Sequence, residues 1–544
     1  FRTAFPEIEI RSVTSGFPQS ELGVGVAHPA FPHEINKIFE IVEPEPSDIT
    51  QLLWALGLIP IAVSDHWSFV LDVLFCGLTL AATRFHEVTN MPFWKVDKFV
   101  RRSLGPNPFR AHDAIGARGA NFLTWSCLHH LAQHYGALFS PSAVLEEHKD
   151  SGTNWYPPNH FRPLVNWSLD DETELETWVH GPLFQMAALM VSEERSHLAQ
   201  INAIGELCAQ FSRGVLAAIR ARGATAAIST VETYHKLHPE AATQAWHPEA
   251  FARIESPEWQ QLYVNAEHDG EVGVISLSRE SYSWDVDAEF NRAIDWLHKE
   301  KIERVIVTGD FHLATQMVGA DTADFYPAMS DAAAGEAVAA GWSRTARRLH
   351  DDFKVSVGLV NGKRCLGGML ELLMHCHYLV AVDGAELGMP EVMLPVVPGM
   401  EGCHWPFRRM ASEDWPRFLE LLLTGRSVRS SEAVGWLADF VGGLDDALQI
   451  AYTVASGGEH GLELRALADA ALDNVVAAAP DLAPAASPEM EAGRRAILDA
   501  IRAATSTTLG EALDVQARHS GGFMTGDACR RGVIGTAWKK TVLV

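Results

Sequence analysis

The alternation of short strand-like runs with helix-length segments after residue 263 limits the fold of this chain more than any other feature. The strand-like runs are residues 272–277, 305–308, 355–360 and 378–382, and helix-length segments such as 289–299 and 332–352 lie between them. Strands that alternate with helices in this way are typical of a parallel sheet covered by helices. We therefore predict an α/β domain over residues 261–544, with helices at its C-terminal end.

The first 260 residues have a different pattern. A strand-like run at 23–27 and an apolar run at 38–42 predict the edge of a parallel sheet within residues 1–52. Apolar residues then recur at helical spacing, which predicts a helical domain over residues 53–152 and a second helical region with a linker over residues 153–260.

The charge of the chain excludes some partners. Its 43 Lys and Arg residues against 69 Asp and Glu residues give a formal net charge of -26, and no segment gathers the basic residues into a stripe. We therefore expect no nucleic acid partner. The most apolar stretch, residues 52–80, is interrupted by Asp65, His66 and Asp72. Because a membrane span needs an uncharged run of about 18 residues or more, we expect no membrane partner.

The cysteines indicate a reducing compartment. The chain has 7 of them and no Cys-x-x-Cys pair, which is typical of free thiols and predicts a cytoplasmic protein. No secretory signal pattern opens the sequence. The triplet His375-Cys376-His377 would point neighbouring side chains in different directions on a helix or strand, so we expect no metal site.

Residues 355–402 carry the clearest chemical pattern. Gly367 and Gly368 precede an apolar helical run that contains Glu371 in its first turn. Two glycines at a helix start allow close backbone approach, and the free N–H groups there form a donor site for an oxygen that carries negative charge. Glu391 follows in a turn after the next predicted strand. Two carboxylates are therefore expected to flank one oxyanion site.

This pattern resembles the enoyl-CoA hydratase (crotonase) family over residues 265–442. The matching runs are Val360-Asn361-Gly362, Leu366-Gly367-Gly368-x-x-Glu371, Leu387-Gly388-Met389-Pro390-Glu391 and Pro398-Gly399, with Gly319-Ala320-Asp321 upstream and residues 421–426 and 431–433 downstream. The resemblance implies the ββα superhelix fold of that family. It also implies that the domain acts on an acyl-CoA thioester.

The same resemblance assigns roles to individual residues. The backbone N–H groups of Ala320 and Gly368 would hold the thioester oxygen, and Glu371 and Glu391 would activate water and protonate the substrate. Gly319, Asp321 and Gly367 would belong to the loops that bind the acyl-CoA. Two acids favour hydration of a 2-enoyl-CoA, without an added cofactor. Isomerase or ring-opening hydrolase chemistry remains an alternative, and relatives lead us to expect a homo-oligomer, trimer-based or dimeric.

The turn after Pro398-Gly399 departs from the small residues usual in this family. Glu401 and His404 stand in it, and Glu401 is either a third acid near the substrate or a side chain that points to water. The overall acidic charge requires a local basic patch for the CoA phosphates. Lys363, Arg364, Arg408 and Arg409 are candidates for it.

A second pattern lies near the N-terminus. His28 precedes Glu40 by twelve residues, and a histidine that contacts a carboxylate can take a proton from an alcohol. This spacing, with Ser15 in Thr14-Ser15-Gly16, resembles the 3-hydroxyacyl-CoA dehydrogenase family, and residues 53–152 resemble the helical C-terminal domain of that family. The resemblance implies that residues 1–52 are a remnant of a dinucleotide-binding domain. The order of the two families resembles fused β-oxidation multifunctional proteins.

Two departures weaken the dehydrogenase assignment. No G-x-G-x-x-G follows a predicted strand anywhere in the chain, and Asp72-Val73 stands where that family has Asn-Arg. NAD is therefore expected only if a nucleotide-binding half precedes these residues. The alternatives are that His28 is a buried structural histidine and that the N-terminal half is a non-catalytic scaffold.

Overall fold

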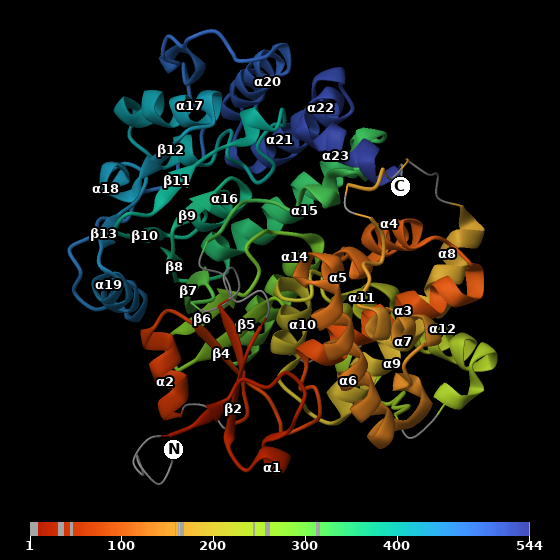
Figure 1. The fold of residues 1–544 in the computed structure, drawn as a ribbon. Coiled ribbons are helices and arrows are strands. Elements are labelled where there is room, and N and C mark those ends of the chain that lie inside the picture. The colour runs from red at the N-terminus through yellow and green to blue at the C-terminus, as the bar shows by residue number, and fades with distance from the viewer. Residues whose placement is uncertain are drawn as a thin grey trace. The chain divides into compact units, whose positions relative to one another are not determined.

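The structure is a computed structural model (Figure 1), and it describes residues 9–30, 37–43, 47–157, 159–161, 163, 168–242, 245–255, 262–311 and 316–542. The chain divides into two compact units: an N-terminal unit of Phe1–Leu262 with Thr541–Val544, and a C-terminal unit of Tyr263–Lys540. The boundary expected at residue 261 lies outside the described residues. Within the described ranges, no helix is both long enough and apolar enough to cross a membrane.

A four-stranded sheet opens the N-terminal unit, with the strands in the order β1, β2, β3, β4. The strands are β1 (Arg11–Ser12), β2 (Gly25–Pro29), β3 (Ile38–Ile41) and β4 (Ile59–Ala62). β1 pairs with β2 and β3 with β4 in parallel, but β2 and β3 are antiparallel. The expected parallel edge is therefore wrong for the central pair. The segment between β2 and β3 is too short for the crossover that parallel neighbours require.

Helices make up most of the rest of the N-terminal unit. They are α1 (Gln19–Leu22), α2 (Asp48–Ala55), α3 (Leu71–Thr89), α4 (Phe93–Leu104), α5 (Pro108–Ile115), α6 (Ala117–Tyr135), α7 (Ala143–Ser151), α8 (Leu169–Leu175), α9 (Gly181–Ser192), α10 (Leu198–Leu207), α11 (Val215–Arg222), α12 (Ala224–Leu237) and α13 (Ala250–Glu255). Helix α3 is buried on most sides and packs against α6 and α9. A helix that is apolar on most faces belongs in the core, and α3 is the central helix of this unit.

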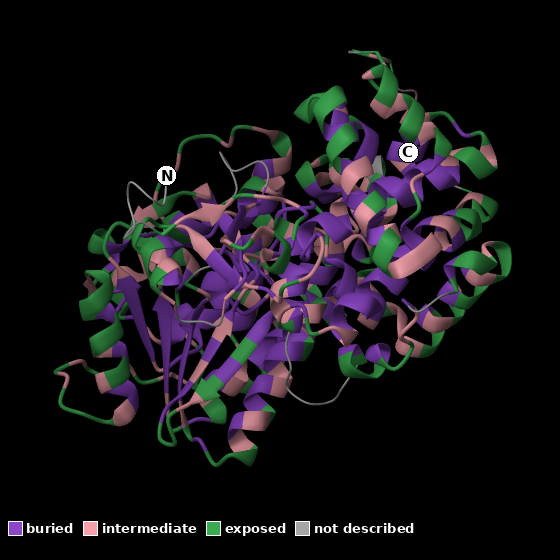
Figure 2. Ribbon diagram, turned by 60° about the horizontal axis from the view of Figure 1, so that its bottom comes forward, coloured by how far each residue is buried: buried purple, intermediate pink, exposed green. Residues whose placement is uncertain are grey.

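The C-terminal unit is built on a six-stranded sheet with the order β13, β10, β8, β7, β6, β5. The strands are β5 (Val264–His268), β6 (Gly273–Leu277), β7 (Arg304–Gly309), β8 (Val355–Val360), β10 (Tyr378–Val382) and β13 (Phe440–Gly442). All neighbours are parallel except β5 and β6. Figure 2 shows these strands mostly buried, as expected for parallel strands whose two faces are both covered. The predicted α/β domain is confirmed.

Ten helices are described from residue 284 onward. They are α14 (Trp284–Lys299), α15 (Ala332–Asp351), α16 (Gly368–Met374), α17 (Trp415–Thr424), α18 (Ser430–Ala433), α19 (Leu444–Ser456), α20 (Pro488–Thr505), α21 (Leu509–Met524), α22 (Asp527–Arg531) and α23 (Val533–Val542). Helix α19 packs on the sheet through Ala447, Ala451 and Val454. Helices α15 and α21 cross closely, because a Cβ on Gly335 would lie 2.8 Å from the Cα of Gly521.

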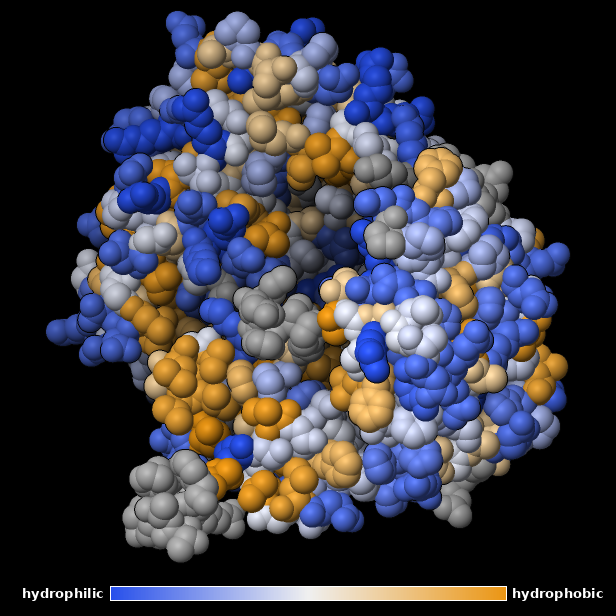
Figure 3. Space-filling view, viewed as in Figure 1, coloured by the Kyte–Doolittle hydropathy of each residue, from blue (hydrophilic) through white to orange (hydrophobic). Residues whose placement is uncertain are grey.

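A smaller sheet of three strands lies beside the main one, and the segments that follow its strands carry the candidate site residues described below. It has the order β12 (Ser427–Arg429), β11 (Glu386–Gly388), β9 (Arg364–Leu366). On the face of the molecule shown in Figure 3, hydrophobic side chains form separate groups among hydrophilic ones. Such exposure of individual apolar side chains is normal for a protein surface.

Candidate active site

The two glutamate motifs of the C-terminal unit follow neighbouring strands. β9 and β11 run parallel, with Leu366 opposite Gly388, and the Gly367 N–H donates to the Gly388 carbonyl at 2.8 Å. Glu371 lies one turn into α16, which follows β9, and Glu391 begins the 3-10 turn that follows β11. Because both segments leave the same edge of a parallel pair, the two carboxyl groups are brought to one place.

A third segment lies against β9. The Met317 N–H donates to the Arg364 carbonyl at 2.9 Å, and the Leu366 N–H donates to the Met317 carbonyl at 2.7 Å. Farther along, the Tyr282 N–H donates to the Gly319 carbonyl and the Asp321 N–H to the Tyr282 carbonyl. These bonds fix the backbone on both sides of Ala320. The Ala320 N–H itself has no acceptor among the described residues.

Within the part of the chain that the structure describes, the Gly368 N–H likewise has no acceptor. It is the first N–H of α16, and such groups have no partner within their own helix. A Cβ built on Gly368 would lie 3.7 Å from the Ala320 nitrogen, so the two amides are close neighbours. Both residues line a cavity of about 60 Å³ together with Glu371, Glu391 and Met400. Two unpaired N–H groups at a cavity wall can bind a carbonyl oxygen that gains negative charge.

Glu371 is fully enclosed and held by backbone donors. Its Oε1 accepts hydrogen bonds from the Met400 N–H at 3.0 Å and the Gly402 N–H at 2.7 Å. Burial raises the pKa of Glu371 to about 7, although these amides pull it down. The Gly402 position has no room for a side chain, because a Cβ there would lie 2.7 Å from Glu371 Oε1.

Glu391 has a different environment. Its Oε2 is buried and accepts no hydrogen bond among the described residues. Burial raises the pKa of Glu391 well above its ordinary range, and the charge of Glu371 raises it further. A Cβ on Gly367, where φ is +53°, would lie 2.6 Å from Glu391 Oε1. Each carboxyl group therefore packs against a glycine, and Glu391 is the one that retains its proton more strongly.

The other expected residues of this site have local roles. Gly319 takes a φ of +91°, which favours glycine, and lines the cavity. The Asp321 carboxylate accepts hydrogen bonds from the Ala323 N–H at 2.9 Å and from Arg279 at 3.0 Å. Asp321 therefore shapes its own turn, and its side chain is not among those that line the cavity.

Two expectations about charged residues are wrong. Glu401 does not point to water and does not line the cavity, because it is fully buried in an ion pair with Arg347. The guanidinium of Arg408 is turned inward to the carbonyls of residues such as Ala470 and Thr507, and that of Arg409 to the carbonyls of Met374 and His377. Each saturates buried carbonyl groups, so neither belongs to a basic surface patch.

The residues that hold Glu371 were not identified from the sequence. Met400 and Gly402 bind through backbone N–H groups, and a sequence pattern, which records side chains, does not reveal backbone donors. The available signal was Gly402, a second glycine three residues after Gly399. A glycine at such spacing indicates that the backbone passes close to another group.

The N-terminal unit contains a separate pair. The register of β2 and β3 sets His28 opposite Glu40, and His28 Nδ1 lies 2.7 Å from Glu40 Oε2. Glu40 Oε1 accepts hydrogen bonds from the Val70 and Leu71 N–H groups, both at 3.0 Å, at the start of α3. Burial opposes the charged form of His28, but the hydrogen bond to Glu40 and the charge of Asp72 raise its pKa.

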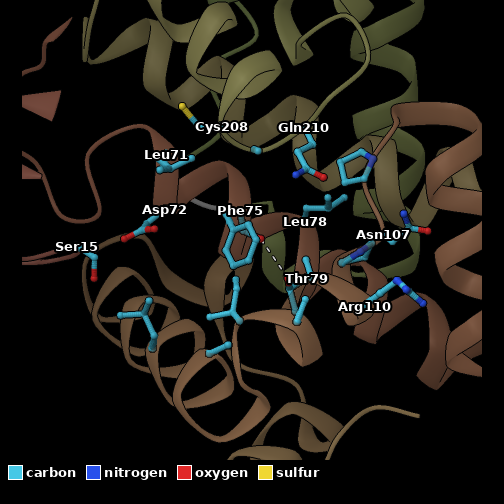
Figure 4. A pocket seen from close by; sticks show the side chains of 18 of the residues that line it. Ser15, Leu71, Asp72, Phe75, Leu78, Thr79, Asn107, Arg110, Cys208 and Gln210 are labelled. Atoms are coloured by element: carbon cyan, nitrogen blue, oxygen red, sulfur yellow. Dashed lines mark hydrogen bonds between the residues drawn. The ribbon is translucent and has the colours of Figure 1, made fainter. Parts of the chain in front are cut away.

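This pair lies at a large cavity of about 590 Å³ (Figure 4). Ser15, His28 and Asp72 line it, and Glu40 lies behind His28 with no exposed surface. In the view of Figure 4, Ser15 and Asp72 lie at one end, and Asn107 lies at the other. Burial raises the pKa of Asp72 well above its ordinary range. The cavity thus has a polar end that can exchange protons and an apolar middle formed by residues such as Leu71, Phe75 and Leu78.

Parts of this chain are similar in sequence to known proteins. No family model matches the chain. A probable enoyl-CoA hydratase of Mycobacterium bovis is 31% identical over 175 residues, which are 31% of this chain and 64% of that protein. The fatty acid oxidation complex subunit alpha of Idiomarina loihiensis is 33% identical over 147 residues, 27% of this chain and 20% of that protein. The chain therefore spans less than two thirds of the length of either relative.

Among solved structures, a carnitinyl-CoA dehydratase from Mycobacterium thermoresistibile matches with a TM-score of 0.38 and 18% identity, covering 50% of this chain and 89% of that one. The sequence similarities connect the chain with hydratases and with fatty acid oxidation proteins. Part of this chain is therefore similar in sequence to enoyl-CoA hydratases.

Proposed function

We propose that the C-terminal unit catalyses the reversible addition of water to a 2-enoyl-CoA. The observation that carries this proposal is the juxtaposition of two buried carboxyl groups, Glu371 and Glu391, with two N–H donors that have no acceptor among the described residues, all at one cavity. The similarity to enoyl-CoA hydratases supports the same reaction. The proposal requires no metal or organic cofactor, because both proton carriers are side chains of the chain.

The free N–H groups of Ala320 and Gly368 would bind the thioester oxygen. Addition of water at Cβ moves electron density onto that oxygen, so its bonds to the two amides strengthen as the reaction proceeds. Loss of one such donor in other enzymes costs about 3–4 kcal/mol of transition-state stabilisation. The bonds that fix the backbone around Ala320 keep its N–H oriented before substrate arrives.

The two acids would divide the proton transfers. Two buried carboxyl groups that interact titrate as a pair, and burial raises the pKa of both of them. Glu371, whose carboxylate is stabilised by two amides, would be the base that takes a proton from water. Glu391, whose pKa burial raises further, would be the acid that delivers a proton to Cα. In the reverse direction the two roles exchange.

The substrate would be an acyl-CoA thioester, and we extend the proposal to a homo-oligomer, trimer-based or dimeric, in the cytoplasm. All seven cysteines are buried free thiols, which supports a reducing compartment. Lys363 and Arg364 are exposed and remain candidates for the CoA phosphates. Light scattering of the purified chain tests the oligomeric state.

Hydration of crotonyl-CoA, followed as the loss of enoyl-thioester absorbance, tests the reaction. The chain should hydrate it, and the variant Glu371→Gln should be strongly impaired while its circular dichroism is unchanged. Undetectable hydration of crotonyl-CoA and of longer enoyl-CoAs by the folded parent chain would overturn the proposal.

We propose a second function for the N-terminal cavity: binding of the 3-hydroxyacyl-CoA product, with His28 accepting the proton of its hydroxyl group. The 2.7 Å contact between His28 and Glu40, at the polar end of a cavity of about 590 Å³, favours this candidate. A histidine beside a carboxylate is held in the tautomer that accepts a proton at its other nitrogen.

The described residues of this unit do not fit the NAD that oxidation of such an alcohol would need. The turn from β4 to α3 contains no glycine, and Glu40 already occupies the first amides of α3. A dinucleotide pyrophosphate binds at a glycine-rich turn with free amides at the helix start. No hydride transfer is therefore assigned to these residues.

Calorimetric titration with 3-hydroxybutyryl-CoA tests the second function. Two sites per chain are expected, and Leu78→Trp, which fills the N-terminal cavity, should leave one. A single site in both proteins would contradict the proposal and favour a scaffold role for this unit.

A further inference from the structure

Glu401 has an unusual position in the C-terminal unit. It lies in the loop after Pro398-Gly399, between the two residues whose amides hold Glu371, and its φ is +70°. Left-handed backbone is unfavourable for a glutamate, and a buried carboxylate is unfavourable unless it is paired. Because Glu401 is fully buried as well, the surrounding structure must hold it there.

Two side chains, those of Arg347 and His375, hold the Glu401 carboxylate. Arg347 of α15 donates from Nε to Oε2 at 2.8 Å and from Nη2 to Oε1 at 2.5 Å, which is a bidentate contact. The same Nη2 donates to the Leu509 carbonyl at 2.7 Å. His375 of α16 lies 3.1 Å from Oε2 through its Nε2. Through Arg347, Glu401 is thus connected by hydrogen bonds to helix α15 and to the start of α21.

His375 connects this cluster with the catalytic acid. Its Nδ1 lies 2.8 Å from the backbone carbonyl of Glu371, while its Nε2 faces the Glu401 carboxylate. Both ring nitrogens therefore face acceptors, one on the helix that carries Glu371 and one on Glu401. His404 Nε2 lies 2.9 Å from Glu401 Oε1 without the alignment of a hydrogen bond. The cluster therefore contacts both the helix that carries Glu371 and the loop that binds the carboxyl group of Glu371.

We propose that Glu401, held by Arg347 and His375, is a positioning residue that fixes the loop of residues 398–402 so that its amides bind the Glu371 carboxyl group. The inference rests on the proposed hydratase function for its kinetic consequence, but the placement of the loop does not depend on that function. Arg347 and Glu401 touch no part of the cavity, so they act through Glu371.

The test compares Glu401→Gln, Arg347→Gln and Arg347→Lys in the full chain. For the two glutamine variants we expect kcat for crotonyl-CoA to fall about 100-fold, because a small displacement of a catalytic group has effects of this size. KM should change less than about threefold, since the thioester donors are untouched. Arg347→Lys keeps the charge but not the bidentate contact, and it should recover part of kcat.

Hydrogen exchange of the Met400 and Gly402 amides supplies a readout that needs no activity. Exchange should be faster in both glutamine variants than in the parent chain, and intermediate in Arg347→Lys. If Glu401→Gln does not fold, the two Arg347 variants carry the test. The matched control is Arg348→Gln, which breaks the pairs of the next residue on α15 with Asp295 and Asp352 and should change neither measurement.

Unchanged exchange and unchanged kcat in folded Arg347→Gln would overturn the positioning role. Equal losses in kcat and in affinity would overturn it as well. If the parent chain lacks hydratase activity but the exchange result is as expected, the positioning role stands and the proposed reaction fails.

Discussion

In each of the two units, backbone N–H groups bind a buried glutamate, but the side chain next to that glutamate differs. Glu371 accepts two backbone N–H groups at one oxygen, and Glu40 does the same at the start of α3. Beside Glu371 stands a second carboxyl group, Glu391, whereas Glu40 directs its other oxygen to His28. Backbone donors thus fix the acid in both places, and the neighbour decides the chemistry.

The difference in neighbours determines where protons reside. Burial raises the pKa of both Glu371 and Glu391, and the charge of Glu371 raises that of Glu391 further, so this pair releases its protons at a higher pH than free carboxyl groups do. Although burial opposes it, the hydrogen bond to the Glu40 carboxylate raises the pKa of His28, so this ring binds a proton more tightly than a free imidazole does. The C-terminal site is therefore suited to moving two protons during addition of water. The N-terminal pair is suited to accepting one.

We expect the largest loss of hydration rate when either of the two acids is replaced. Glu371→Gln and Glu391→Gln should each lower kcat for crotonyl-CoA hydration by about 10³-fold, within the range of general acid–base catalysis. His28→Gln should leave that rate unchanged, because His28 belongs to the other unit. Steady-state rates with crotonyl-CoA measure all three. Equal loss in His28→Gln would show that the two sites do not act separately.

We expect the second-largest fall in kcat when the glycine beside Glu371 is replaced. Gly402→Ala should reduce kcat about 100-fold, because its Cβ would lie 2.7 Å from Glu371 Oε1 and displace the carboxyl group. Gly510→Ala, with nothing within 4 Å of its Cβ, is the control and should behave as the parent chain. A Gly402→Ala enzyme with normal kcat would place Glu371 elsewhere during the reaction.

The pH dependence of hydration should follow Glu371. As the base it must be ionised, and its pKa is raised to about 7, so kcat should fall about tenfold for each pH unit below that value. Stability should change in the opposite direction. Because folding raises the pKa of Glu371 from 4.5, protonated Glu371 contributes to the free energy of unfolding. This contribution is complete below pH 4.5 and is lost as pH rises through about 7. Rates and urea unfolding measured across this range separate the two effects.

The smallest effect should appear at Asp72 in the N-terminal unit. Burial raises its pKa, so the stability contributed by its protonated form is lost as pH rises through that value. Asp72→Asn should therefore increase the free energy of unfolding at alkaline pH by about 1–3 kcal/mol, the scale of a buried polar group without full compensation. Urea unfolding at two pH values measures it, and a destabilised variant would contradict this account of Asp72.

Much of the C-terminal site was accessible from sequence because its elements are local. The alternation of strands and helices predicted the sheet, and Gly367, Gly368, Glu371 and Glu391 lie within short motifs that end neighbouring strands. The antiparallel pairing of β2 with β3 was missed, because apolar runs do not reveal strand direction.

The role of Glu401 was missed for a related reason. Its partner Arg347 is 54 residues away, and nothing in the local pattern of either residue indicates the contact. The amides of Met400 and Gly402 were missed because backbone groups are the same in every sequence. Contacts between residues far apart in the sequence, and hydrogen bonds from backbone donors, could be identified only from the structure.

The most direct test of the paired-acid account is a double-mutant cycle on crotonyl-CoA hydration with Glu371→Gln, Glu391→Gln and the double variant. Groups that act as one unit give losses that do not multiply. The account predicts that the double variant is nearly as active as the slower single variant. Losses that multiply, or single variants with the rate of the parent chain, would contradict it.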